Sequence, residues 1–154
     1  MNIKIIIFIF FFFVQSGCKT NKTDKNKISI YQLHPYFFED TSIINDKLHH
    51  DKIRYYILDG NTANVKYLST FIHRFIKDSI KNEFEKFNNY QIMFFKSRKG
   101  FDKNYVTTPK DFIDHHGDDL LANFGWYNGH LSLDAFYKNG EQLYEFEDVK
   151  LSDP

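Results

Sequence analysis

Two short segments combine histidine with aspartate, the residue types that bind zinc and other divalent metals. One segment is Asp114-His115-His116-Gly117-Asp118-Asp119 and the other is His49-His50-Asp51. Imidazole nitrogens and carboxylate oxygens are ordinary ligands of such metals, so His115, His116 and Asp118 are the candidate ligands. Neither segment has a spacing that a rigid element imposes, such as His-x-x-x-His on a helix. The first segment is therefore expected to be a solvated loop before the C-terminal strands, and the sequence predicts no metal cofactor.

Two further arrangements suggest acid–base or nucleophilic chemistry. Asp134 and Glu145 are expected to lie directly opposite each other on neighbouring strands, and close carboxylates can share a proton or a cation, as in glycosidases. Ser69 or Ser79 could act with His73 on a helix, and Ser69 is spaced to touch His73, but no glycine-framed nucleophile turn and no positioned acid accompany them. A polar sheet face and a polar helix face explain both arrangements without catalysis. The sequence also lacks a phosphate loop and a dinucleotide fingerprint, so it predicts no cofactor and favours a non-enzymatic role.

The clearest element that would position these groups is a helix expected between Thr62 and Phe87. Apolar residues recur there at the three- and four-residue spacing of one buried face, and Asn61 or Thr62 can cap the first turn. The members of this face are Val65, Leu68, Ile72, Phe75, Ile76, Ser79 or Ile80, Phe84 and Phe87. Such a helix would be about 38 Å long and would need a sheet to cover its apolar face.

The C-terminal third predicts a three-stranded antiparallel meander. Asn128-Gly129 and Asn139-Gly140 each lie between alternating runs, and Asn-Gly accepts the positive φ angles that two-residue hairpin turns need. With both turns in one register, Phe124 faces Leu133 on an apolar face. The other face is polar and holds a candidate protein-binding surface. Its members are His130, Asp134, Glu145 and Glu147.

The order of the elements predicts the fold class. Further strands are expected at Ile28–Phe38, Ile53–Leu58 and Tyr90–Ser97, a short helix is expected at Lys110–His115, and Glu39–Lys52 has no clear pattern. A strand, a long helix and then several antiparallel strands predict an α+β domain, with the helix laid across one face of an antiparallel sheet. This order resembles that of cystatin-like folds in architecture alone. No inhibitory motif of that family is present, so the resemblance implies no function.

The N-terminus has the pattern of a secretory signal. A positively charged start, Met1–Lys4, precedes an unbroken apolar run, Ile5–Val14, which is shorter than the roughly 20 residues that span a bilayer. Ser16-Gly17-Cys18 follows, and it contains the only cysteine. This arrangement resembles the lipobox of bacterial lipoproteins, although Gln15 stands where leucine is commonest. The resemblance implies cleavage before Cys18 and lipidation of its thiol.

These features predict the organisation and role of the chain. Residues 1–17 form the signal peptide, residues 18–27 form a lipidated tether without apolar side chains after the cysteine, and residues 28–154 form one α+β domain. Lys19 after the cysteine is compatible with sorting to the outer membrane of a bacterial envelope. The formal net charge is zero, so nothing favours nucleic acid as a partner.

The expected function is therefore that of an envelope lipoprotein. Its acyl chains would insert into the bilayer and its domain would bind another envelope protein, as an accessory or immunity-type module. Two alternatives stay open at this point. One is a metal- or carboxylate-dependent hydrolase, and the other is a carrier of a small apolar or glycan ligand between helix and sheet.

Overall fold

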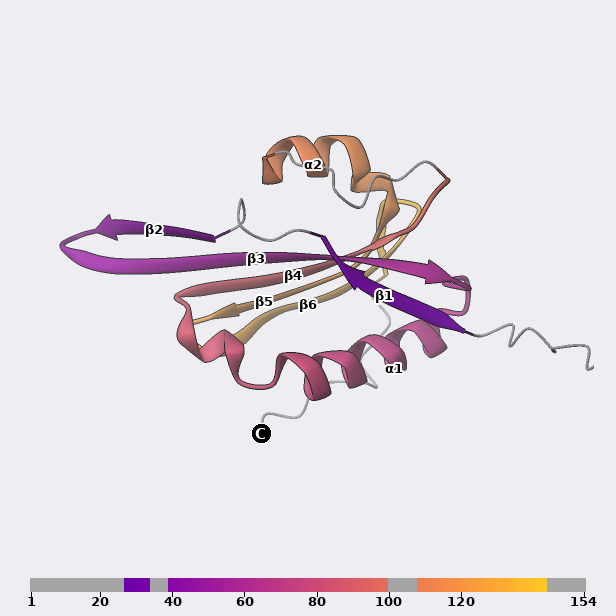
Figure 1. Cartoon of the computed structure of the whole chain (residues 1–154), viewed down its shortest axis with the longest axis horizontal. Helices are drawn as coiled ribbons and strands as arrows, with labels where there is room; N and C mark the ends of the chain where they lie inside the picture. Colours follow the sequence, from indigo (N-terminus) through magenta and orange to yellow (C-terminus); the bar gives the residue numbers. More distant parts are fainter. Residues whose placement is uncertain (1–26, 34–38, 100–107, 144–154) are drawn as a thin grey trace, which may run out of the picture.

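The computed structural model describes residues 27–33, 39–99 and 108–143. One twisted sheet dominates them, with a helix on each side (Figure 1). Its described strands are β1 (Ile28–Gln32), β2 (Glu39–Ile44), β3 (Lys47–Gly60), β4 (Asn89–Lys96), β5 (Leu120–Tyr127), β6 (His130–Lys138) and β7 (Glu141–Leu143). The helical segments are α1 (Val65–Phe75), a π-helical continuation (Ile76–Ile80), a 3-10 turn (Glu83–Lys86), α2 (Pro109–His116) and a second 3-10 turn (Gly117–Asp119).

The expected fold class, one long helix on an antiparallel sheet, is wrong. The strand order is β1-β3-β4-β5-β6-β7, with β2 also paired to β3, and β3 and β4 run parallel to each other. The other described pairs are antiparallel, so the sheet is mixed. The reason is the helical connection, because a helix that lies along the sheet returns the chain to the end where β3 began. The cystatin-like order, which rested on an antiparallel sheet, no longer applies.

The helix is also shorter than the predicted Thr62–Phe87. Asn64 caps it by accepting from the Tyr67 N–H at 3.0 Å, and its helical and π-helical turns end at Lys81, whose φ is +51°. The chain must then enter β4, which begins opposite Asp51, about 30 Å along β3 from Gly60. A straight helix of about 38 Å would overshoot this point.

The last two apolar residues of the predicted helix still reach the core. Phe84 lies in the 3-10 turn and stacks on Trp126, with 5.1 Å between ring centroids, and Phe87 packs on Tyr90 at 5.4 Å. The helical spacing therefore identified residues that are buried or partly buried, but a shorter helix and a separate turn deliver them.

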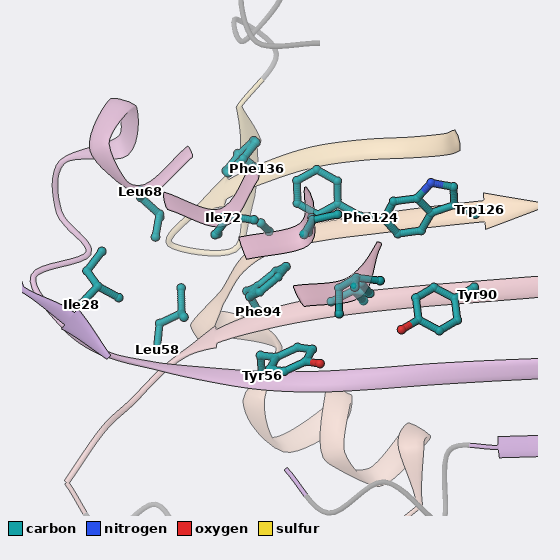
Figure 2. Packing of buried hydrophobic residues seen from close by; sticks show 14 of the residues in the cluster. Ile28, Tyr56, Leu58, Leu68, Ile72, Tyr90, Phe94, Phe124, Trp126 and Phe136 are labelled. Carbon is teal, nitrogen blue, oxygen red and sulfur yellow. The ribbon is translucent and has the colours of Figure 1, made fainter. Parts of the chain in front are cut away.

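The central strands are covered on both sides. On the α1 face, Leu68 and Ile72 of the helix meet a cluster of strand side chains (Figure 2). The labelled members are Ile28, Tyr56, Leu58, Tyr90, Phe94, Phe124, Trp126 and Phe136. On the α2 face, Phe112 is fully buried, with its ring centroid 4.7 Å from that of Tyr55 and 5.0 Å from that of Phe95. The expected short helix at Lys110–His115 is thus confirmed, and it covers the second face.

The meander itself is confirmed, as β5, β6 and β7 with both predicted turns. Asn128 and Asn139 have φ angles of +48° and +54°, and each following glycine has +81°. A residue with a Cβ atom has a higher conformational energy in this left-handed region, and the increase is smaller for asparagine than for most residues. The Asn-Gly pairs therefore fix where each strand reverses.

The register between β5 and β6 differs from the prediction. A β-bulge between Gly125 and Trp126 leaves Leu133 opposite Gly125, and Phe124 pairs with Asp134. The expected pairing of Phe124 with Leu133 is therefore wrong. Because side chains alternate along a strand, this one-residue shift moves Asp134 to the α1 face.

The segment Glu39–Lys52, which shows no clear pattern in the sequence, forms a β-hairpin. Its turn is Asn45-Asp46, with φ angles of +52° and +61°. β4 pairs with β3 only from Asp51 onwards, so the hairpin projects beyond the sheet (Figure 1). We call residues 39–52 the arm.

Candidate functional sites

The side chains of the first histidine cluster contact different neighbours. Within the described ranges, no group of three or more histidine, cysteine, aspartate or glutamate side chains is placed to hold a metal ion. His115 donates through Nδ1 to the carbonyl of Asp111 at 2.7 Å, within α2. His116 Nδ1 lies 3.8 Å from Asp119 Oδ2, and the same carboxylate pairs with Arg98. Burial, and then the positive charge of Arg98, lower the pKa of His116. These side chains therefore hold the end of α2.

The second histidine cluster divides between different partners. His50 Nε2 lies 2.9 Å from Glu39 Oε1, and its ring packs on Phe87 with 4.5 Å between centroids. Asp51 accepts from the side-chain amide of Asn89 at 2.8 Å. His49 pairs across the arm with Ser42 and therefore points to the face opposite His50. The cluster has no common centre.

Ser69, His73 and Asp134 meet beneath α1. The predicted contact is confirmed, because Ser69 Oγ lies 3.2 Å from His73 Nδ1, and Asp134 Oδ2 lies 3.5 Å from the other ring nitrogen, Nε2. His73 Nδ1 also lies 2.8 Å from the Ser69 carbonyl. A nitrogen that donates to this carbonyl cannot accept the serine proton, and Ser69 is fully buried. The three groups therefore connect α1 to β6, and they present no nucleophile to a substrate.

The predicted binding surface is not one surface. Glu145 and Glu147 lie outside the described residues, and with them the predicted carboxylate pair Asp134/Glu145. His130 lies opposite Tyr127 on the α2 face, whereas Asp134 lies opposite Phe124 on the α1 face. The expectation that His130 and Asp134 share a face is wrong, and the β-bulge in this hairpin is the reason.

A row of charged residues that the sequence analysis missed fixes the root of the arm. Arg54 donates to Gln32 Oε1 at 3.1 Å and forms an ion pair with Glu83. Lys52 Nζ lies 2.7 Å from Glu39 Oε2 and 3.6 Å from Glu83 Oε1. The hydrogen bond from Lys52 lowers the pKa of Glu39. The signal was present in the sequence, because charged side chains at every second position of a strand share a face.

The arm carries the most exposed aliphatic side chains of the described chain. Ile43 is 75% exposed, Leu48 is 68% exposed and Ile44 is 47% exposed. Ile43 and Leu48 lie directly opposite each other, so they share a face. The other large apolar residues reported as exposed among the described residues, Tyr67, Ile113 and Tyr127, come from different elements. Apolar exposure is therefore concentrated at one projecting end.

The chain matches no protein-family model, no curated protein and no solved structure. Within residues 27–33, 39–99 and 108–143, no helix combines the length and the apolar character needed to cross a membrane.

Proposed function

We propose that this protein is a lipid-anchored component of a bacterial cell envelope, held at the outer membrane, whose domain binds another protein. The arm carries this proposal. Folding gains nothing from exposed apolar side chains, and clustered ones mark surfaces that another molecule covers. Ile43 and Leu48 form such a cluster at a position that a partner can reach.

The anchoring part rests on the N-terminal sequence. A charged start, a short apolar run and Ser16-Gly17-Cys18 resemble a lipoprotein signal. Lys19–Lys27 would then separate the acyl chains from the domain by up to about 30 Å. Several acyl chains give stable attachment where one chain gives only marginal binding.

Binding fits the described residues better than the two alternatives do. A hydrolase needs a nucleophile or a metal-bound water that substrate can reach, and Ser69 is buried against His73. A carrier needs room between α1 and the sheet. There, Phe94 already contacts Phe75 and Phe124, with ring centroids 6.0 and 6.1 Å apart. No described feature favours either alternative.

Fractionation of cells that produce the full chain tests the proposal. The wild-type protein should be recovered from membranes with covalently bound lipid, and Cys18→Ser should lose both the lipid and the membrane attachment. After detergent extraction, the wild-type protein should co-purify with one protein in constant ratio. A Cys18→Ser variant that stays membrane-bound and normally processed would contradict the anchor. A wild-type protein that is extracted alone would contradict the binding role.

A further inference from the structure

The two faces of the arm differ in polarity and charge, and this difference indicates the chemistry of a partner surface that could cover each face. On the α1 face the cross-strand pairs are Ile43/Leu48, Thr41/His50 and Glu39/Lys52. On the α2 face they are Ile44/Lys47, Ser42/His49 and Asp40/Asp51. The first face has an apolar tip, and its charges at the root neutralise each other, because Lys52 pairs with Glu39. The second face ends in two carboxylates.

On the second face, Asp51 accepts hydrogen bonds from Asn89, but neither Asp40 nor Asp51 has a described cationic side chain within ion-pair distance. The two aspartates lie directly across the ribbon from each other. Like charges at directly opposed positions destabilise a strand pair. A cation brought by another molecule would remove this repulsion, so the root of the arm is complementary to a basic side chain.

A lipid bilayer does not fit the tip. Ile43 and Leu48 are joined by Ile44, the turn Asn45-Asp46 and Lys47, so insertion would carry the charges of Asp46 and Lys47 towards the hydrocarbon. Each such charge costs about 2.5 to 3.5 kcal/mol at the centre of a membrane.

The arm also points away from the anchored end of the domain. The tether would enter at Ile28, which pairs with Gly60 at the end of β3, and Leu48 lies near its beginning. The strand between Leu48 and Gly60 spans about 40 Å. The tip of the arm therefore lies at the opposite end of β3 from the residue where the proposed tether enters the domain.

A second copy of the chain is a poor partner for the arm. The remaining exposed apolar residues among those described, Tyr67, Ile113 and Tyr127, lie on separate elements and form no matching surface.

The root of the arm is held in place. Glu39 on β2 contacts both His50 and Lys52 on β3, and Lys52 also reaches Glu83 of the 3-10 turn. Binding costs less free energy when the binding element is already ordered. These contacts therefore prepare the arm for insertion as a rigid ribbon.

From these features we infer that the arm inserts into a cleft of a partner protein. This cleft has one apolar wall and one basic wall. The apolar wall covers Ile43 and Leu48, and a lysine or arginine of the other wall meets Asp40 and Asp51. This inference rests on the proposed protein-binding function and specifies the partner's chemistry.

Site-specific photo-crosslinking of the full, lipid-anchored chain in its native host tests the cleft. A photoreactive amino acid replaces Ile43 on one face or His49 on the other, and Tyr127, which is 54% exposed on the sheet, is the control position. The same protein should be crosslinked from positions 43 and 49. The yield at each of these positions should exceed the yield at position 127 by at least about tenfold, as expected for side chains at the centre of an interface.

Charge reversal then tests the basic wall. Asp40→Lys should lower the crosslinking yield at both arm positions by about tenfold or more, because it sets two cations against each other. Asp40→Asn should lower the yield less. The matched control is Asp78→Lys, a reversal at an exposed residue of the π-helical turn, and it should leave the yield unchanged. With the crosslinked protein purified, Ile43→Ser/Leu48→Ser should weaken its binding by at least about tenfold.

Each other outcome overturns the inference. Adducts with lipid or with a second copy of the chain would show a different occupant. A protein adduct from only one arm face would exclude a cleft, and equal effects of the Asp40 and Asp78 reversals would exclude the basic wall. A protein adduct at position 127 without one on the arm would overturn this inference while leaving the proposed binding function intact.

Discussion

The two ends of strand β3 show opposite environments for the same residue type. Leu58 and Leu48 lie ten residues apart on one strand and on the same face, yet Leu58 is fully buried and Leu48 is 68% exposed. At Leu58 the strand is flanked by β1 and β4 and covered by α1. At Leu48 it has only β2 beside it. Burial is therefore decided by the neighbouring elements, and an apolar side chain without them has no role in the core.

This difference separates what stabilises the fold from what is available for binding. Fully burying a leucine side chain contributes about 1.5 to 3 kcal/mol to stability, and an exposed one contributes little. Buried aromatic and aliphatic side chains on both faces of the central strands supply this stabilisation. The arm supplies almost none, so its apolar tip remains exposed for the proposed partner to cover.

The largest expected effect compares one substitution at both ends of β3. Leu58→Ala should lower the free energy of unfolding by about 2 to 5 kcal/mol, because it leaves a cavity under α1. Leu48→Ala should change it by less than about 0.5 kcal/mol. Chemical denaturation followed by circular dichroism measures both values. Equal losses at the two positions would break the comparison.

The second prediction concerns the junction between the arm and the sheet. Glu83→Gln removes the charge that faces both Arg54 and Lys52, which are largely shielded from water. The free energy of unfolding should fall by about 1 to 2 kcal/mol, less than for a fully buried pair because all three groups keep some solvent contact. Glu85→Gln, an exposed neighbour in the same turn, should have no measurable effect in the same denaturation experiment.

The third prediction concerns the residue that ends the helix. Lys81 has φ +51° and ψ −127°, a conformation that strains a residue with a Cβ atom. Lys81→Gly should therefore raise the free energy of unfolding by about 1 kcal/mol, even after the cost of a more flexible unfolded chain. Lys81→Ala keeps the Cβ atom and should give no such gain. A glycine variant less stable than the alanine variant would show that Lys81 is unstrained.

The smallest effect is a pH dependence at the end of α2. Burial lowers the pKa of His116 below its ordinary value of 6.5, so the unfolded chain takes up this proton at a higher pH than the folded chain. The resulting stability is complete above pH 6.5 and declines as the pH falls from there to the folded pKa.

His116→Gln removes this proton uptake and serves as the comparison. Thermal melts at several pH values should show the wild type losing stability relative to the variant as the pH drops below 6.5. Parallel curves for the two proteins would contradict the shielded position of His116.

Local signals in the sequence predicted several elements correctly. The Asn128-Gly129 and Asn139-Gly140 turns, the strand at Tyr90–Ser97 and the short helix at Lys110–His115 follow from turn chemistry and from short-range periodicity. These are properties of neighbouring residues, and the structure satisfies them to within about two residues at the element ends.

Non-local arrangements were predicted less well. The parallel pairing of β3 and β4 follows from a strand–helix–strand order, but the strongly antiparallel C-terminal third suggested one orientation for the whole sheet. The helix length depends on where β4 must begin, which no local pattern contains. The β-bulge at Gly125 has no clear local signal, and it alone moved Asp134 from the expected face to His73.

The candidate sites divide in the same way. The contact between Ser69 and His73 was predictable from helical spacing, whereas their contact with Asp134 required the register of a different hairpin. The arm was not predicted because most of its residues are polar and show no alternating pattern, although its turn has a recognisable sequence. Asn45-Asp46, two residues that tolerate positive φ, follows Ile44 and precedes Lys47-Leu48, which is the position of a hairpin turn.

The yield of a protein adduct from a photoreactive residue at position 48, relative to one at position 127, tests the role of the arm most directly. Both positions are more than half exposed, at 68% and 54%, so exposure alone predicts similar yields. With the lipid-anchored chain in its native envelope, one discrete protein adduct should form at position 48, in at least about tenfold excess over position 127. Similar yields at the two positions would contradict a docking role for the arm.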